Sequence, residues 1–96
     1  MKRLTPKEVR TATALVPLWT RRGKVLTRTL TLTDFRAALT LVNAIGRVAE
    51  KAGHHPDIAI SWNRVRLDLT THDAGGLTAL DFALAAKIDA LTARRA

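Results

Sequence analysis

The chain has 96 residues, of which 47% are hydrophobic and 25% are charged, and it contains no cysteine. This is the size and composition of one globular domain over residues 1–96, which excludes a disordered tail, a collagen-like repeat, a disulfide scaffold and a thiolate metal site. Sixteen lysines and arginines against eight acidic residues give a net charge of +8, and residues 1–28 alone hold eight of the basic side chains and one acid.

The basic segment over residues 1–28 can attract polyanions. No nucleic-acid-binding motif accompanies it, so we expect a solvated cationic face and no sequence-specific nucleic-acid partner. No apolar run approaches the ~20 residues that cross a bilayer. The basic start Met1-Lys2-Arg3 is not followed by the hydrophobic stretch of a signal peptide. We therefore expect a cytoplasmic protein with no membrane partner.

The first predicted element is a helix that begins after Thr5. Thr5 is a good N-cap residue, Pro6 suits the first helical position, and Glu8 completes a capping box. The helix is expected to run to about Leu15, because Pro17 then stops it.

Residues 19–32 predict a β-hairpin that has Trp19 in its first strand and Arg22-Gly23 at its turn. The second strand is rich in β-branched residues, which favour extended backbone. Alternation gives this strand an apolar face that consists of Leu26, Leu30 and Leu32.

The second predicted helix begins at Thr33-Asp34 and ends at Gly53, because glycine readily takes the left-handed conformation that terminates helices. Apolar residues at helical spacing predict its buried face: Phe35, Leu39, Val42, Ile45 and Ala49. The opposite, polar face comprises Arg36, Thr40, Asn43, Arg47 and Lys51.

Two short strands follow, with a predicted turn at Asn63-Arg64. The earlier strand carries Ile58, Ile60 and Trp62 on one face, and we expect Trp62 to serve in the core or in an interface. The later strand alternates apolar with polar residues, and its apolar side chains are Val65, Leu67 and Leu69.

Thr78 is the predicted N-cap of a last helix, with Asp81 as its capping-box partner. Arg94 and Arg95 suit the negative end of this helix. Its apolar stripe consists of Leu80, Leu84, Ile88 and Leu91. The resulting order α-β-β-α-β-β-α predicts an α+β fold, a single two-layer domain in which helices pack on one face of a four-stranded antiparallel sheet.

The three histidines are the candidate reactive groups. His54 and His55 follow the second helix and His72 follows the fourth strand, so the fold can bring their two loops to one edge of the sheet. Imidazole exchanges protons near neutral pH. On composition alone, the more ordinary interpretation is a polar helix exit and a loop residue. Three imidazoles can also hold zinc, but adjacent histidines diverge and no further ligand is suitably spaced, so we predict no metal site.

The residues around the histidines carry a more specific signal. They read Glu50-Lys51-Ala52-Gly53-His54-His55-Pro56-Asp57, Trp62-Asn63-Arg64-Val65, Thr70-Thr71-His72-Asp73, Gly75-Gly76-Leu77-Thr78 and Asp81. This pattern resembles the signature of the pterin-4a-carbinolamine dehydratases, and weaker similarity extends upstream to Trp19 and Arg28. The family often has aromatic residues at three positions where this chain has Ile58, Leu30 and Leu32.

The resemblance implies a hydro-lyase that dehydrates 4a-hydroxytetrahydrobiopterin, a pterin carbinolamine, to quinonoid dihydropterin and water, without a cofactor of its own. This reaction recycles the pterin of aromatic amino-acid hydroxylases. The resemblance further implies that His54 and His72 are the acid/base pair, whereas His55 holds the pterin and assists catalysis. Further substrate contacts are implied for Pro56, Thr71 and Asp73. Supporting carboxylates are implied at Glu50 and Asp81, although Asp81 is equally well explained as the box partner of Thr78.

Members of this family form dimers and tetramers, so the resemblance also implies a homodimer or homotetramer. Some relatives lose the histidines and serve as assembly factors. The alternative function is therefore that of a catalytically silent coregulator or assembly factor, and the presence of His54, His55 and His72 favours the enzyme. Because loop histidines contribute little burial, we expect the fold to survive their replacement.

Overall fold

The computed structural model describes residues 2–93, so Arg94 and Arg95 lie outside the described residues. The described chain follows the predicted order α-β-β-α-β-β-α. Its helices and strands are α1 (Pro6–Ala14), β1 (Thr20–Arg22), β2 (Val25–Thr31), α2 (Phe35–Ala52), β3 (Asp57–Ser61), β4 (Arg64–Leu69) and α3 (Ala79–Ala93), with a short 3₁₀ helix η1 (His72–Ala74) before α3.

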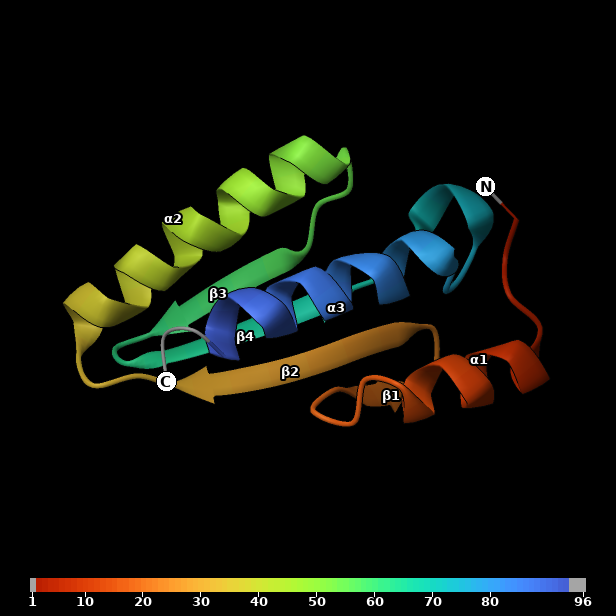
Figure 1. The fold of residues 1–96 in the computed structure, drawn as a ribbon, viewed down its shortest axis with the longest axis horizontal. Helices are drawn as coiled ribbons and strands as arrows, with labels where there is room; N and C mark the ends of the chain where they lie inside the picture. The colour runs from red at the N-terminus through yellow and green to blue at the C-terminus, as the bar shows by residue number, and fades with distance from the viewer. Residues whose placement is uncertain (1, 94–96) are drawn as a thin grey trace.

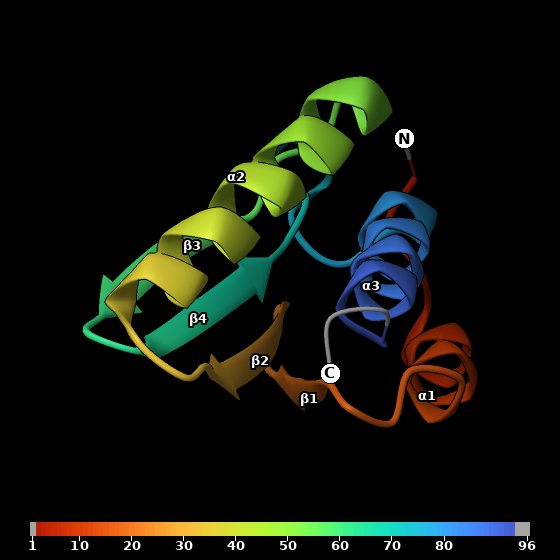
Figure 2. The same ribbon diagram turned by 60° about the vertical axis from the view of Figure 1, so that its left-hand side comes forward.

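The four strands form one antiparallel sheet in the order β1-β2-β4-β3. Val65 in β4 lies between Leu30 of β2 and Ile60 of β3, which fixes the register of the three longer strands. Helices α2 and α3 lie on the same face of the sheet, while α1 lies beyond α3 at the β1 side (Figures 1 and 2). The predicted two-layer α+β fold is therefore confirmed.

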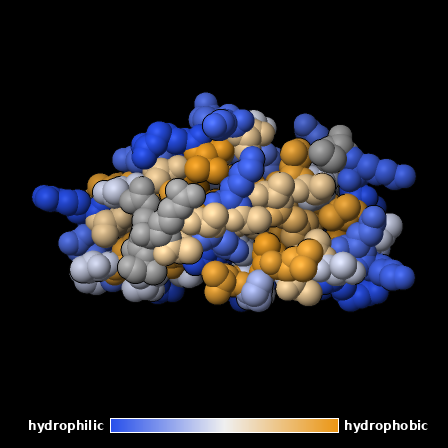
Figure 3. Space-filling model, viewed as in Figure 1, coloured by the Kyte–Doolittle hydropathy of each residue, from blue (hydrophilic) through white to orange (hydrophobic). Residues whose placement is uncertain are grey.

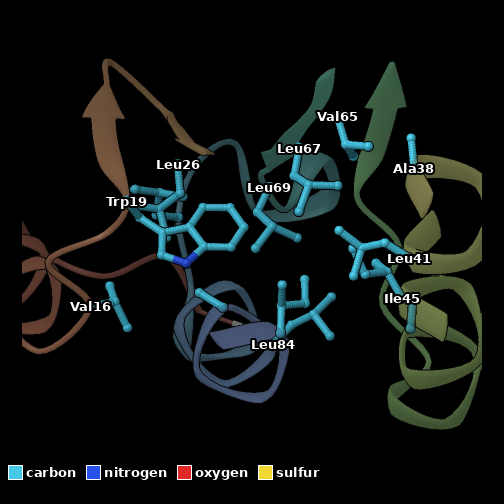
Figure 4. Close-up of a cluster of buried hydrophobic side chains, with 14 residues drawn as sticks. Val16, Trp19, Leu26, Ala38, Leu41, Ile45, Val65, Leu67, Leu69 and Leu84 are labelled. Atoms are coloured by element: carbon cyan, nitrogen blue, oxygen red, sulfur yellow. The ribbon is translucent and has the colours of Figure 1, made fainter. Parts of the chain in front are cut away.

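The core lies between the sheet and the helices α2 and α3 (Figure 4). Strands β2 and β4 supply fully buried side chains, and the helices cover them from the other layer. Burial of one such side chain stabilises the fold by about 1.5–3 kcal/mol. The largest apolar side chains of this core are Leu26, Leu41, Ile45, Val65, Leu67, Leu69, Leu84 and Ile88.

The helix ends follow their predicted local chemistry. Thr5 Oγ1 accepts from the Glu8 backbone N–H, and Glu8 Oε1 accepts from the Thr5 N–H at 2.9 Å. These hydrogen bonds hold the pKa of the Glu8 carboxyl below its ordinary value. Asp34 caps α2 through the Ala37 N–H, and Gly53 ends α2 with a φ of 66°. Within residues 2–93, none of the helices is long and apolar enough to cross a membrane.

Both predicted turns are wrong by one residue. The first turn lies at Gly23-Lys24, where Gly23 takes a φ of 57°, and Trp19 precedes β1 and is buried at 3% exposure. The second turn lies at residues 62–63, because Ser61 pairs with Arg64 and closes the β3–β4 ladder. Trp62 consequently has a φ of 53° and is 67% exposed, so it does not belong to the core.

The predicted buried face of α2 is also partly wrong. Phe35 and Leu39 are 48% and 41% exposed. The helix instead turns a face with three alanines toward the sheet, and these small side chains let it approach closely while Leu41 and Ile45 fill the core. The observed buried face is Ala38, Leu41, Ala44, Ile45 and Ala49.

Candidate functional site

His54 is placed by the end of α2. The left-handed Gly53 redirects the chain, and the His54 N–H still donates to the Ala49 carbonyl. The His54 side chain then meets α3, where its Nε2 lies 2.6 Å from Asp81 Oδ1. Only 12% of the His54 side chain is exposed, and Asp81 is completely buried. The first histidine is thus a fixed, largely buried group.

Asp81 is the centre of a buried polar network at the start of α3. Its Oδ2 accepts from the Thr78 backbone N–H at 2.9 Å and from the Thr71 hydroxyl at 2.8 Å. The hydroxyls of Thr71 and Thr78 also lie 2.8 Å apart. One oxygen of Asp81 thus accepts from the Thr78 N–H, as the partner in a capping box does, and the other oxygen contacts His54.

This network determines which imidazole nitrogen of His54 is available. A carboxylate that already accepts two hydrogen bonds on Oδ2 acts as an acceptor on Oδ1 as well, so His54 Nε2 is the donor. The remaining nitrogen, Nδ1, then carries the lone pair that can take a proton.

His72 lies on η1, directly after Thr71. Thr71 is tied to Asp81 through its hydroxyl, and its backbone forms an isolated antiparallel bridge with Gly76 that closes the loop around η1. Asp81 therefore connects the loop of His54 with the loop of His72. Figure 1 shows the end of α2, η1 and the start of α3 at the same end of the molecule.

The other predicted site residues are held less firmly. His55 Nε2 donates to Glu50 Oε2, but both side chains are well exposed, at 60% and 77%. His72 and Asp73 are exposed on η1, and within residues 2–93 no hydrogen bond fixes either side chain. Pro56 is half-buried beside the histidine pair. The described residues contain no group of three or more metal-ligating side chains.

Sequence reasoning missed a second polar cluster, at the opposite end of α3. Arg28 lies on the core-facing side of β2 and pairs with Asp89 at 2.6 Å. Asp89 also accepts from the indole Nε1 of Trp19, and Arg28 donates to the Thr92 hydroxyl. The available signal was an arginine between Leu26 and Leu30 in an otherwise apolar pattern. This cluster joins β2 to α3 and lies away from the histidines.

Comparison with known proteins identifies relatives over most of the chain. Residues 2–91 match the family model described as pterin 4 alpha carbinolamine dehydratase. A provisionally named pterin-4-alpha-carbinolamine dehydratase of Acidobacterium capsulatum is 50% identical over 91 residues, which cover 95% of this chain and 99% of the relative. A provisionally so named protein of Chloroflexus aurantiacus is 53% identical over 89 residues, which cover 93% and 96%.

Solved structures agree with these relatives. The crystal structure of a transcriptional coactivator/pterin dehydratase from Brucella melitensis superposes with a TM-score of 0.88 at 33% identity, covering 94% of this chain and 98% of that one. A pterin dehydratase-like RuBisCO assembly factor of the alpha-carboxysome shares the fold, with a TM-score of 0.61 at 22% identity over 76% of this chain and 84% of that one. The chain belongs to the pterin-4a-carbinolamine dehydratase family.

Proposed function

We propose that this chain dehydrates 4a-hydroxytetrahydrobiopterin to quinonoid dihydropterin and water, as a hydro-lyase that recycles the pterin of aromatic amino-acid hydroxylases. The observation that carries the proposal is the buried Asp81 carboxylate, which binds His54 on one oxygen and Thr71, the neighbour of His72, on the other. Two histidine loops are thereby tied to one anchor. This arrangement suits a reaction that moves protons at two atoms of one small substrate.

The reaction needs one proton removed and one proton supplied. As the C4a–O bond breaks, the oxygen must take up a proton to leave as water, and the N5 proton must depart as the C4a–N5 double bond forms. His54 is suited to take the N5 proton on Nδ1, because Asp81 supports the resulting imidazolium. His72, exposed on η1, is suited to donate the proton to the leaving oxygen.

The remaining residues are proposed to hold the pterin. His55 follows His54 in the chain, is oriented by Glu50, and is proposed to assist catalysis chiefly by binding the ring. Pro56 and Asp73 flank the two histidine loops and are proposed as further substrate contacts. Thr71 contributes through its backbone, since its hydroxyl is already engaged with Asp81 and Thr78. We propose no metal and no organic cofactor.

The first test is turnover of His72→Ala, measured as release of quinonoid product in a coupled hydroxylase assay after subtraction of the uncatalysed dehydration. Loss of a positioned proton-transfer group lowers kcat by roughly 10²–10⁴-fold. Because His72 is exposed, this variant is expected to fold normally. Lys51→Ala, an exposed change at the end of α2, serves as the matched control and is expected to retain full turnover.

His54 needs a different design. At 12% exposure and bonded to buried Asp81, it does not fit the earlier expectation that loop histidines can be removed freely. His54→Ala is therefore paired with His54→Asn, which keeps a polar group near Asp81, and both are checked by thermal unfolding before assay. Near-native turnover in a folded His54 variant and in His72→Ala would contradict the proposed enzymatic function.

Dialysis against a strong chelator is expected to leave turnover unchanged. A loss of turnover that only added zinc restores would contradict a metal-independent site.

We also propose that residues 1–96 form one domain of a cytoplasmic homodimer or homotetramer. The exposed apolar side chains Phe35 and Leu39 on α2, together with Trp62, support an interface between copies. The alternative function, a silent coregulator or assembly factor, draws support from what two structural relatives are called. A folded wild-type protein without dehydratase activity would favour that alternative.

A further inference from the structure

A cavity of about 320 Å³ has neither Asp81 nor a histidine in its lining, although two of its residues, Gly76 and Leu77, follow the His72 loop. Residues of the N-terminal segment, α1, β1, the β1–β2 turn and positions 76–77 line this open cavity, and its size is at the lower end of the range of small-molecule sites. Figure 3 shows hydrophilic side chains at the end of the molecule where α1 and the N-terminal segment lie, as well as at the opposite end. The residues that line the cavity are Arg3, Leu4, Pro6, Val9, Arg10, Arg21, Gly23, Lys24, Gly76 and Leu77.

The charge of this cavity is of one sign. Arg3, Arg10, Arg21 and Lys24 line it, and no acidic side chain does. Within residues 2–93, none of these four cations forms an ion pair. Converging cations without a counter-charge raise the local concentration of anions and repel one another until an anion binds. The cavity therefore selects a ligand that carries more than one negative charge.

The wall next to Arg3 is held by specific backbone contacts. The Leu4 N–H donates to the Leu77 carbonyl at 2.9 Å, and Arg3 Nη1 donates to the Gly75 carbonyl at 3.3 Å. A Cβ atom at Gly76 would lie 2.7 Å from Arg3 Cδ, so any side chain at this position would displace the arginine from its present path across the loop. Arg3 is thus positioned by the fold and does not simply extend into solvent.

Part of the cavity lining is apolar, which restricts further the kinds of ligand that the cavity can bind. The apolar side chains among the lining residues, here called the floor, are Leu4, Pro6, Val9 and Leu77, and Leu77 is buried at 3% exposure. A bare inorganic anion would leave these side chains uncovered. A nucleic-acid strand is disfavoured, because no aromatic side chain lines the cavity to stack on a base.

We propose that this cavity binds a small phosphate ester with an apolar organic part. The arginines donate to the phosphate oxygens, for which the planar guanidinium is well matched, and the organic part covers the apolar floor. This site is separate from the proposed dehydratase site and does not depend on that activity.

The test uses isothermal titration calorimetry at physiological salt with phenyl phosphate and inorganic phosphate as probes. Phenyl phosphate is expected to bind about tenfold or more tightly than inorganic phosphate, because the ring covers apolar surface. The double variant Arg10→Gln/Arg21→Gln is expected to weaken phenyl phosphate binding by at least about tenfold.

The matched control is Lys7→Gln/Arg22→Gln, which removes the same charge from the same two elements. Lys7 and Arg22 do not line the cavity, and Arg22 follows Arg21 on a strand, where successive side chains point to opposite faces. This control is expected to weaken binding less than about threefold, as expected for distant, screened charges. His72→Ala is expected to bind phenyl phosphate as tightly as the wild type.

Several results would overturn the proposal. Equal weakening by the two double variants would reduce the effect to net charge. Loss of binding in His72→Ala would move the ligand to the histidine site. Equal affinity for phenyl phosphate and inorganic phosphate would show that the apolar side chains of the floor do not contribute to binding. Binding confined to an oligonucleotide or to phosphatidic acid vesicles, with none to phenyl phosphate, would assign the cations to a macromolecular surface instead.

Discussion

Two adjacent histidines each pair with a carboxylate, but the two pairs lie in opposite environments. The His54–Asp81 pair is 12% and 0% exposed, whereas the His55–Glu50 pair is 60% and 77% exposed. The chain leaves α2 through Gly53 in a left-handed conformation, so that His54 meets α3 while His55 stays at the surface. An imidazole paired with a carboxylate is therefore a rigid, desolvated group in one case and an adaptable, solvated one in the other.

The largest expected effect is that of Asp81→Ala. This change leaves His54, the Thr71 hydroxyl and the Thr78 N–H without their buried acceptor. Removal of one partner from a buried pair typically lowers the free energy of unfolding by about 3–5 kcal/mol. Urea unfolding followed by circular dichroism measures the loss.

Asp81→Asn separates the effect of Asp81 on the orientation of His54 from its effect on folding, since asparagine keeps an acceptor oxygen while it removes the charge. If kcat of Asp81→Asn falls although the variant is folded under assay conditions, Asp81 acts by positioning His54. Asp73→Ala, an exposed carboxylate on η1, is the stability control and is expected to change the free energy of unfolding by less than about 0.5 kcal/mol. If Asp81→Ala lowers the free energy of unfolding no more than Asp73→Ala does, the buried His54–Asp81 pair does not differ from the exposed pair in its contribution to stability.

His55→Ala is expected to have a smaller effect, and of a different kind. Because His55 is exposed and proposed to hold the ring, its removal is expected to raise KM several-fold and to change kcat less. Steady-state kinetics on purified pterin carbinolamine separates the two parameters. A fall in kcat as large as that of His72→Ala, with KM unchanged, would place His55 in the proton transfer itself.

Glu50→Gln is expected to have the smallest effect. Exposed ion pairs contribute about 0–1 kcal/mol, and salt screens them further. Thermal unfolding at low and high ionic strength is expected to show a small difference from the wild type that shrinks as salt is added. A loss comparable to that of Asp81→Ala would mean that the exposed pair is structural after all.

Local signals predicted much of this molecule. The capping residues Thr5, Asp34 and Gly53 act over one helical turn, so the helix ends could be predicted from neighbouring residues. The spacing of Thr78 and Asp81 predicted the hydrogen bond from the Thr78 N–H to the Asp81 carboxylate for the same reason, whereas the Thr78 hydroxyl accepts from the Leu80 N–H and not from the Asp81 N–H. Each of these interactions is contained within a few residues, and tertiary packing has little influence on it.

What sequence reasoning could not supply depends on packing between elements. Phe35 and Leu39 have the spacing of a buried face, yet the alanines of α2 pack closer to the sheet. Trp62 continues an alternating strand pattern, yet the register of β3 against β4 places it in the turn. The contact of His54 with Asp81 joins residues 27 positions apart, and the family resemblance implied a supporting carboxylate at Asp81 but not which histidine it contacts.

The opposite placement of the two tryptophans has a spectroscopic consequence. Trp19 is 3% exposed and donates its indole N–H to Asp89 at 2.8 Å, whereas Trp62 is 67% exposed in a surface turn. With only these two tryptophans in the chain, native fluorescence divides into a shielded blue component and a solvent-exposed red one. Acrylamide therefore quenches the red component first. The blue emission reports on the junction of β2 with α3, and the red emission reports on any partner that covers the tip of the β3–β4 hairpin, so no added fluorophore is needed.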